Sequence, residues 1–153
     1  MSKRSAGLVM CRQRGGRLEV LLVHPGGPFF RKKDEGAWTL PKGLVEEGED
    51  PLATAKRELV EETGFDAEAD VYHPLGEVKQ KGGKVVTAWA FEGDCDPAEL
   101  ESNTFELEWP PRSGQKQNFP EVDRAAWFPL DEAHTKINPA QRPFLTRAAQ
   151  TLR

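Results

Sequence analysis

The chain has 153 residues, and its 21 Lys and Arg against 25 Asp and Glu give a formal net charge of −4. This acidic balance weighs against general nucleic-acid binding, because such proteins need a basic face that displaces counterions from phosphates. The length and the hydrophobic fraction of 37% predict a single globular domain over residues 1–153.

The first part of the chain predicts a β-hairpin followed by a loop. Strands are expected at 7–12 and 18–23, because the Arg14-Gly15-Gly16-Arg17 stretch between them is a hairpin turn signal. The Pro- and Gly-rich stretch 24–28 predicts a loop. This loop is expected to continue through the basic run 31–33.

A helix is predicted at 51–63. Asp50 can cap its first N–H groups, and Pro51 suits the first helical position. Gly64 can adopt the positive φ that ends a helix.

The second half of the chain predicts further strands and two helices. Strands are expected at 71–79, 84–91, 104–109 and 125–128. Helices are expected at 131–136 and 139–152, and the apolar residues of the second recur at helical spacing. Hairpins combined with a crossover helix predict an α/β layered domain with a mixed sheet.

The predicted helix 51–63 carries three glutamates on one stripe. At about 100° per residue, Glu61 and Glu62 lie within about 60° and 40° of Glu58. Arg57 can offset part of their repulsion through Glu61, four residues further on. Two interpretations stay open: a solvated acidic face, or a site for a hard divalent cation, since Mg²⁺ prefers carboxylate and phosphate oxygens.

A longer motif surrounds these glutamates. Gly43 is followed after five residues by Glu49 and after seven more by Arg57-Glu58, and the motif ends on Gly64-Phe65. The pattern G-x5-E-x7-R-E-U-x-E-E-x-G-U, with U a bulky apolar residue, matches the Nudix box at every fixed position. The chain therefore resembles the Nudix hydrolase superfamily. The resemblance implies the Nudix fold, an α/β/α sandwich with a mixed β-sheet. It also implies an enzyme that hydrolyses a diphosphate joining a nucleoside to another group.

The resemblance also implies roles for single residues. The implied ligands of Mg²⁺ or Mn²⁺ are Gly43 through its carbonyl, Glu58, Glu61, Glu62 and, outside the box, Glu121. The implied catalytic residues are Glu49, Arg57 and Glu58. Arg57 would orient the carboxylates, and either Glu49 or Glu58 would be the general base for an attacking water. Glu61 could act through water, and Glu121 could equally be a surface carboxylate.

Three further residues are candidates for substrate binding. Lys42 could contact a phosphate, Trp109 could stack on a base, and Arg112 could meet a phosphate. Lys42 could instead be a plain loop lysine. Trp109 could instead anchor the 104–120 insertion to the core.

The substrate class follows from two finer resemblances. The Trp38–Gly43 segment is similar to the W-x-x-P-K-G segment of dinucleoside polyphosphate and diphosphoinositol polyphosphate hydrolases. The ranges 36–43, 108–114 and 119–128 resemble a bacterial subgroup of predicted NTP pyrophosphohydrolases. We therefore expect a nucleotide substrate of the NTP or dinucleoside polyphosphate class. A non-catalytic nucleotide-sensing module and an RNA 5′-end pyrophosphohydrolase stay open as alternatives.

Two features bear on location and partners. Cys11 and Cys95 fit no disulfide framework, and reduced thiols are typical of a cytoplasmic protein. The longest aliphatic run, 20–23, is too short to cross a bilayer, so no membrane partner is expected. The resemblance leaves a homodimer open.

Overall fold

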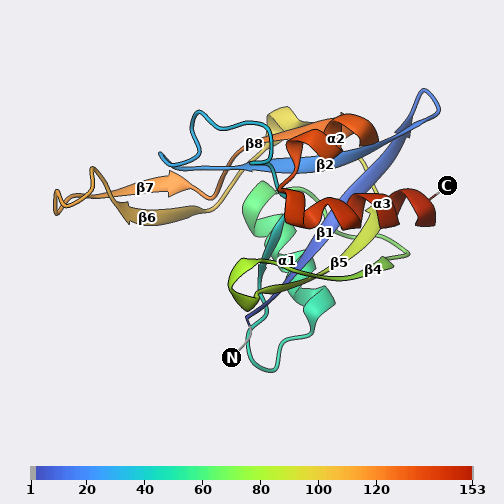
Figure 1. Cartoon of the computed structure of the whole chain (residues 1–153), viewed down its shortest axis with the longest axis horizontal. Coiled ribbons are helices and arrows are strands. Elements are labelled where there is room, and N and C mark those ends of the chain that lie inside the picture. The colour runs from blue at the N-terminus through green and yellow to red at the C-terminus, as the bar shows by residue number, and fades with distance from the viewer. Residues whose placement is uncertain (1–2, 153) are drawn as a thin grey trace.

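One mixed β-sheet is the middle layer of the computed structural model, which describes residues 3–152 (Figure 1). Its strands are β1 (Arg4–Arg14), β2 (Arg17–Pro25), β3 (Lys42–Leu44), β4 (His73–Lys79), β5 (Val85–Glu92) and β8 (Val122–Pro129). The order is β4-β5-β1-β2-β8, and β3 also pairs with β1. β1 and β5 are parallel, whereas the other pairs of this sheet are antiparallel. The predicted mixed sheet is confirmed.

Helices cover both faces of this sheet. On one face, Leu59 of α1 (Pro51–Thr63) packs in the same core cluster as Leu8 of β1. On the other face lie α2 (Leu130–Lys136) and α3 (Arg142–Thr151), and Phe144 of α3 shares a second cluster with Val9. Leu8 and Val9 reach different clusters because successive side chains of a strand point to opposite faces. The predicted α/β/α sandwich is confirmed.

α1 has the bounds that its capping residues predict. The Asp50 carboxylate accepts a hydrogen bond of 3.1 Å from the Ala53 N–H. At the other end, Gly64 has φ 76° and donates its N–H to the Val60 carbonyl at 2.8 Å. These local signals fix the helix that carries the three glutamates.

Several other boundaries differ from the prediction. The prediction of a loop at 24–28 is wrong at its start, because β2 continues through Pro25 by pairing with β8. The last predicted helix is divided: 139–141 form a 3₁₀ turn, η3, and α3 begins at Arg142. Two more 3₁₀ turns are η1 (Lys81–Gly83) and η2 (Pro97–Glu99).

A second, two-stranded sheet extends away from the sandwich (Figure 1). It is the hairpin of β6 (Thr104–Glu108) and β7 (Lys116–Pro120), which pair in antiparallel register. The sequence predicts only the first of these strands. β7 is almost entirely exposed, so it has no apolar pattern, and its extended conformation comes from pairing with β6.

Met1, Ser2 and Arg153, which the predicted domain 1–153 includes, lie outside the described residues. No helix within 3–152 has both the length and the apolar composition to cross a membrane.

Candidate active site

Gly43, in the short strand β3, lies against the acidic helix α1. β3 pairs with β1, and Gly43 lies opposite Ala6 in that register. A Cβ atom added at Gly43 would lie 2.0 Å from Cδ of Glu58 and 2.3 Å from its Oε1. The backbone of Gly43 therefore touches the Glu58 carboxylate, and only glycine leaves room for that approach.

Arg57 is hydrogen-bonded to three carboxylates at once. Its Nε and Nη2 each donate to one oxygen of Glu49 at 3.1 Å. Its Nη1 donates to Glu58 at 3.1 Å and to Glu61 at 3.2 Å. This paired donation holds the pKa of Glu49 down at about 2, which makes Glu49 a weak base at neutral pH. Arg57 thus lies where it can orient the acidic side chains.

Glu58 and Glu62 are crowded and largely removed from water. Glu62 accepts a hydrogen bond of 3.1 Å from the backbone N–H of Lys42. Burial, and then the charge of Glu58, raise the pKa of Glu62 to about 8. Burial also raises the pKa of Glu58, and the charges of Glu61 and Glu121 add to the rise while Arg57 opposes it. The negative charge of this pair is therefore poorly compensated by the protein.

Glu121 lies near the same pair, in the turn between β7 and β8. Its charge contributes to the raised pKa of both Glu58 and Glu62. Its backbone is fixed on both sides: the N–H donates to the Asn103 carbonyl, and the carbonyl accepts from the Gly26 N–H, each at 2.9 Å. Glu121, which lies outside the box, is thus near enough for its charge to act on the carboxylates of α1.

The donor set fits a hard divalent cation by its chemistry. Within residues 3–152, no three Asp, Glu, His or Cys side chains are arranged so that they could hold a metal ion. Arg57 gives a physical reason for this arrangement, because oxygens of Glu58 and Glu61 accept hydrogen bonds from its guanidinium group. Burial and mutual repulsion nevertheless disfavour the charged forms of Glu58 and Glu62, and Mg²⁺ would compensate that charge.

The candidate substrate-binding residues lie in different places. Lys42 lines a cavity of about 780 Å³. Trp109 packs edge-to-face on Phe29, with 5.5 Å between ring centroids, so it holds the hairpin to the loop after β2. Arg112 is exposed in the hairpin turn with φ 62°, at the end that points away from α1 (Figure 1). The structure does not bring Arg112 to the carboxylates.

Three residues of the same cavity were missed by the sequence interpretation. Lys81 and Lys84 lie at the turn between β4 and β5, and Asn138 precedes η3. Burial lowers the pKa of the Lys42 ammonium, and the charge of Lys84 lowers it further. Lys42 and Lys84 therefore lie close together. The only feature of the sequence that could have indicated these lysines is the Gly82-Gly83 pair that Lys81 and Lys84 flank.

His24 is a further residue whose role the sequence does not reveal. It is completely buried, and its ring packs edge-on against Trp38. Its Nδ1 lies 2.7 Å from an Asp123 oxygen, and its Nε2 lies 2.7 Å from the Lys33 carbonyl oxygen. His24 thereby joins β2, the basic loop and the start of β8 just after Glu121.

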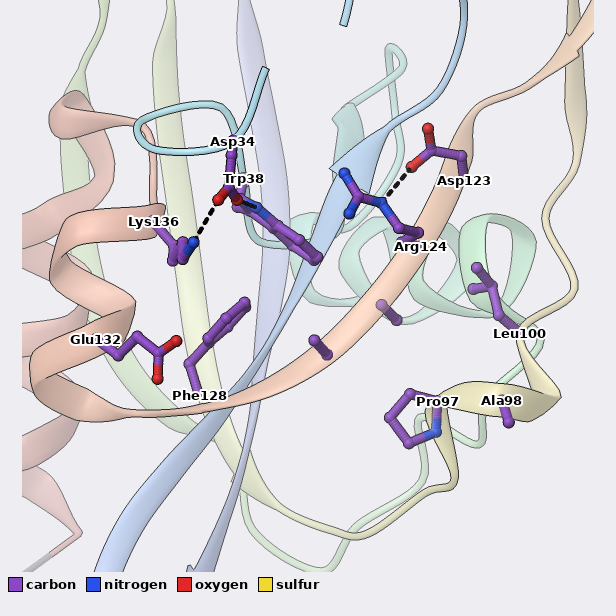
Figure 2. A pocket seen from close by; sticks show the side chains of 12 residues that line it. Asp34, Trp38, Pro97, Ala98, Leu100, Asp123, Arg124, Phe128, Glu132 and Lys136 are labelled. Atoms are coloured by element: carbon purple, nitrogen blue, oxygen red, sulfur yellow. Dashed lines mark hydrogen bonds and ion pairs between the residues drawn. The ribbon is translucent and has the colours of Figure 1, made fainter. Parts of the chain in front are cut away.

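A separate cavity of about 640 Å³ lies along β8 (Figure 2). Trp38 and Phe128 line it, and Asp34 accepts hydrogen bonds from the Trp38 indole and from Lys136 at its rim. It shares no lining residue with the cavity beside Lys42, so the two cavities are distinct.

The raised pKa of Glu62 predicts a pH effect on the metal-free protein. The unfolded chain loses this proton near pH 4.5 and the folded chain near pH 8, so the wild type loses stability as pH rises through that window. In EDTA, the Glu62→Gln variant should therefore gain stability relative to the wild type between about pH 5 and 8. Urea unfolding at several pH values measures the difference, with Glu47→Gln as an exposed control. A difference that does not change with pH would contradict the prediction.

The sequence of the chain is similar to a protein-family model and to several known proteins. The family model described as NUDIX domain matches residues 1–148. The chain is 35% identical over 115 residues to Nudix hydrolase 5 of Arabidopsis thaliana, covering 74% of this chain and 33% of that protein. It is 35% identical over 120 residues to an RNA pyrophosphohydrolase of Rhizobium meliloti, covering 69% of this chain and 66% of that protein. The chain thus spans less than two thirds of the length of both relatives.

Two solved structures share the fold. One is an Ap4A hydrolase of C. elegans in a binary complex, with a TM-score of 0.68 and 24% identity over 98% of this chain and 97% of that one. The other is the NUDIX domain of Shewanella oneidensis NrtR with ADP ribose, with a TM-score of 0.67 and 17% identity over 100% of this chain and 90% of that one. At these identities the likeness is one of fold, and the predicted Nudix fold is confirmed.

Proposed function

Because the chain belongs to the NUDIX domain family, we propose that it is a divalent-metal-dependent pyrophosphohydrolase. Its substrate is a nucleoside diphosphate linked to another group, of the NTP or dinucleoside polyphosphate class. The observation that carries the proposal is the poorly compensated pair Glu58 and Glu62. Glu58 lies against Gly43, and Glu62 accepts a hydrogen bond from Lys42, which lines the lysine-lined cavity.

Each acidic residue has a role in this proposal. Glu58 and Glu62 would hold Mg²⁺ or Mn²⁺ directly, together with the Gly43 carbonyl, while Glu61 would hold it directly or through water. Glu121 would add a ligand from the turn before β8. When bound, the cation would neutralise charge at the phosphates and lower the pKa of the attacking water.

Glu58 is the better candidate for the general base. A general base needs a carboxylate oxygen that is free to accept a proton. Both oxygens of Glu49 accept hydrogen bonds from Arg57, whereas only one oxygen of Glu58 does. In the proposed reaction Glu58 accepts the proton of the attacking water, and Glu49 fixes Arg57.

Arg57→Lys tests the positioning role. A lysine ammonium lacks the planar fork that reaches Glu49 and Glu61 together. We expect kcat to fall by about 10- to 100-fold, as for other residues that orient metal ligands. The matched control is Arg147→Lys, where the arginine bonds only the Leu75 and Glu77 carbonyls. Equal effects of the two substitutions on kcat would rule out the special role of Arg57.

A substrate panel tests the function itself. Nucleoside triphosphates, dinucleoside polyphosphates and nucleoside diphosphate sugars are incubated with Mg²⁺ or Mn²⁺, and the products are identified by mass. Metal-dependent cleavage of a diphosphate bond is expected. Tight binding of these ligands without any cleavage would instead indicate the nucleotide-sensing alternative.

The RNA pyrophosphohydrolase relative favours one second candidate, the 5′ end of RNA. Triphosphorylated RNA therefore joins the panel, and faster cleavage of RNA than of free nucleotides would favour this candidate. For location, we propose the cytoplasm, on the ground that Cys11 and Cys95 are free thiols. The homodimer and the lack of general nucleic-acid binding stay predictions.

A further inference from the structure

The cavity beside Lys42 has an unusual charge pattern. Its volume is about 780 Å³, within the range of small-molecule sites. Three lysines line it, Lys42, Lys81 and Lys84, and no carboxylate does. The remaining polar side chains at its wall are those of Thr39 and of amides such as Asn138 and Gln141. Such a lining favours an anionic ligand with several acceptor oxygens.

The three lysines that line the cavity form no ion pair within the described residues, although the charges of Glu62 and Glu58 act on the Lys42 ammonium. In the part of the chain that the structure describes, the lysines with a carboxylate partner are others: Lys56, Lys116 and Lys136. Lys81 and Lys84 are exposed at the turn between β4 and β5. The Gln80 N–H donates to the Lys84 carbonyl at 2.8 Å, which closes this turn. A short, closed turn thus brings Lys81 and Lys84 to the wall of the cavity.

The opposite wall of the cavity is rigid. Gln141 is completely buried, and its side-chain oxygen accepts from the Leu40 N–H at 3.1 Å. Its side-chain nitrogen donates to the Thr39 hydroxyl at 2.9 Å. These bonds fix the segment that leads into Lys42, so the cavity is preformed rather than assembled by the ligand.

The cavity also adjoins the carboxylates. The Lys42 side chain lines it, while the Lys42 backbone N–H donates to Glu62. The next residue, Gly43, touches Glu58. A chain of phosphates whose one end lies at the cation between Glu58 and Glu62 would meet the lysines with its other end.

We propose that the cavity binds the phosphates beyond the scissile bond, so that Lys81 and Lys84 make the protein selective for substrates with three or more phosphates in a row. This assignment rests on the proposed function for the position of the cation-bound end. The shared chemistry is a linear polyphosphate, whether it comes from a free nucleotide or from the 5′ end of an RNA. Substrates with only two phosphates would leave the two lysines without a ligand.

The first experiment measures binding without catalysis. Inorganic tripolyphosphate is titrated by calorimetry in EDTA into the wild type, into Lys81→Ala/Lys84→Ala, and into Lys79→Ala/Lys116→Ala. The control removes the same charge from lysines that do not line the cavity. We expect the first double variant to bind at least about tenfold more weakly, and the control to bind like the wild type. Equal binding by all three proteins would overturn the proposal.

The second experiment measures selectivity. Kinetics with Mg²⁺ compare a nucleoside diphosphate sugar, a dinucleoside tetraphosphate and a 5′-triphosphorylated RNA. Lys81→Ala/Lys84→Ala should raise KM for the two longer polyphosphates by about tenfold, leave kcat nearly unchanged and leave the two-phosphate substrate unaffected. An equal rise of KM for all substrates would overturn the selectivity. If nothing is cleaved while tripolyphosphate binding still depends on the two lysines, the proposed function fails and the anion site stands.

Discussion

Replacing Glu58 with Gln is expected to lower kcat by more than about a hundredfold, because this residue is proposed as both cation ligand and base. Gln keeps the shape of the side chain and can still accept the hydrogen bond from Arg57 at its amide oxygen. The lost feature is the negative charge, in a site where burial already makes charge costly.

Steady-state kinetics with Mg²⁺ measure this effect, and thermal unfolding checks that the fold is kept. Glu47→Gln is the matched control, because Glu47 is an exposed acid of the same box at a position that the motif leaves free. The control should retain the activity of the wild type. Retained activity in Glu58→Gln would exclude Glu58 from both proposed roles.

Gly43→Ala is expected to abolish most activity through shape rather than charge. The new Cβ would lie 2.0 Å from Cδ of Glu58. Either β3 or the Glu58 side chain must move, and Arg57 holds that side chain in place. We expect a loss of more than about a hundredfold in kcat, as the carboxylate leaves its position. The crowding should also cost about 1–3 kcal/mol of folding free energy.

The control for Gly43→Ala separates stability from activity. Gly114 lies in the turn of the β6–β7 hairpin with φ 75° and open space around it. Gly114→Ala should therefore cost about 1–2 kcal/mol through backbone strain while the activity stays intact. Urea unfolding and kcat are measured for both variants. Similar kcat values for the two would show that Gly43 is not required at the carboxylates.

The helix that carries the site was predictable because its signals are local. Asp50 and Gly64 set both of its ends, and the expected Arg57–Glu61 pair is present at 3.2 Å. The box also indicated that Gly43 belongs with the glutamates, although the reason, contact with Glu58, needs the pairing of β3 with β1.

The missed features depend on contacts between distant segments. β7 has no apolar pattern of its own and exists by pairing with β6. The sequence predicts an ordinary turn around Lys81 and Lys84. These lysines line a cavity only because the turn lies beside Lys42 and Asn138 in the folded chain. His24 looked like a loop residue, yet β2 extends through it and buries its ring completely. These contacts between segments far apart in the chain cannot be predicted from local patterns in a single sequence.

The peptide that joins Lys42 to Gly43 has a consequence for the products of the reaction. Lys42 lines the cavity, Gly43 touches Glu58, and the Lys42 N–H donates to Glu62. In the proposed complex, this short segment therefore sets the distance between the lysines and the bond that is cleaved. Substrates with different numbers of phosphates should be cleaved at the same number of phosphates from the end that the lysines bind. Each substrate should therefore release the same phosphate-containing fragment from that end.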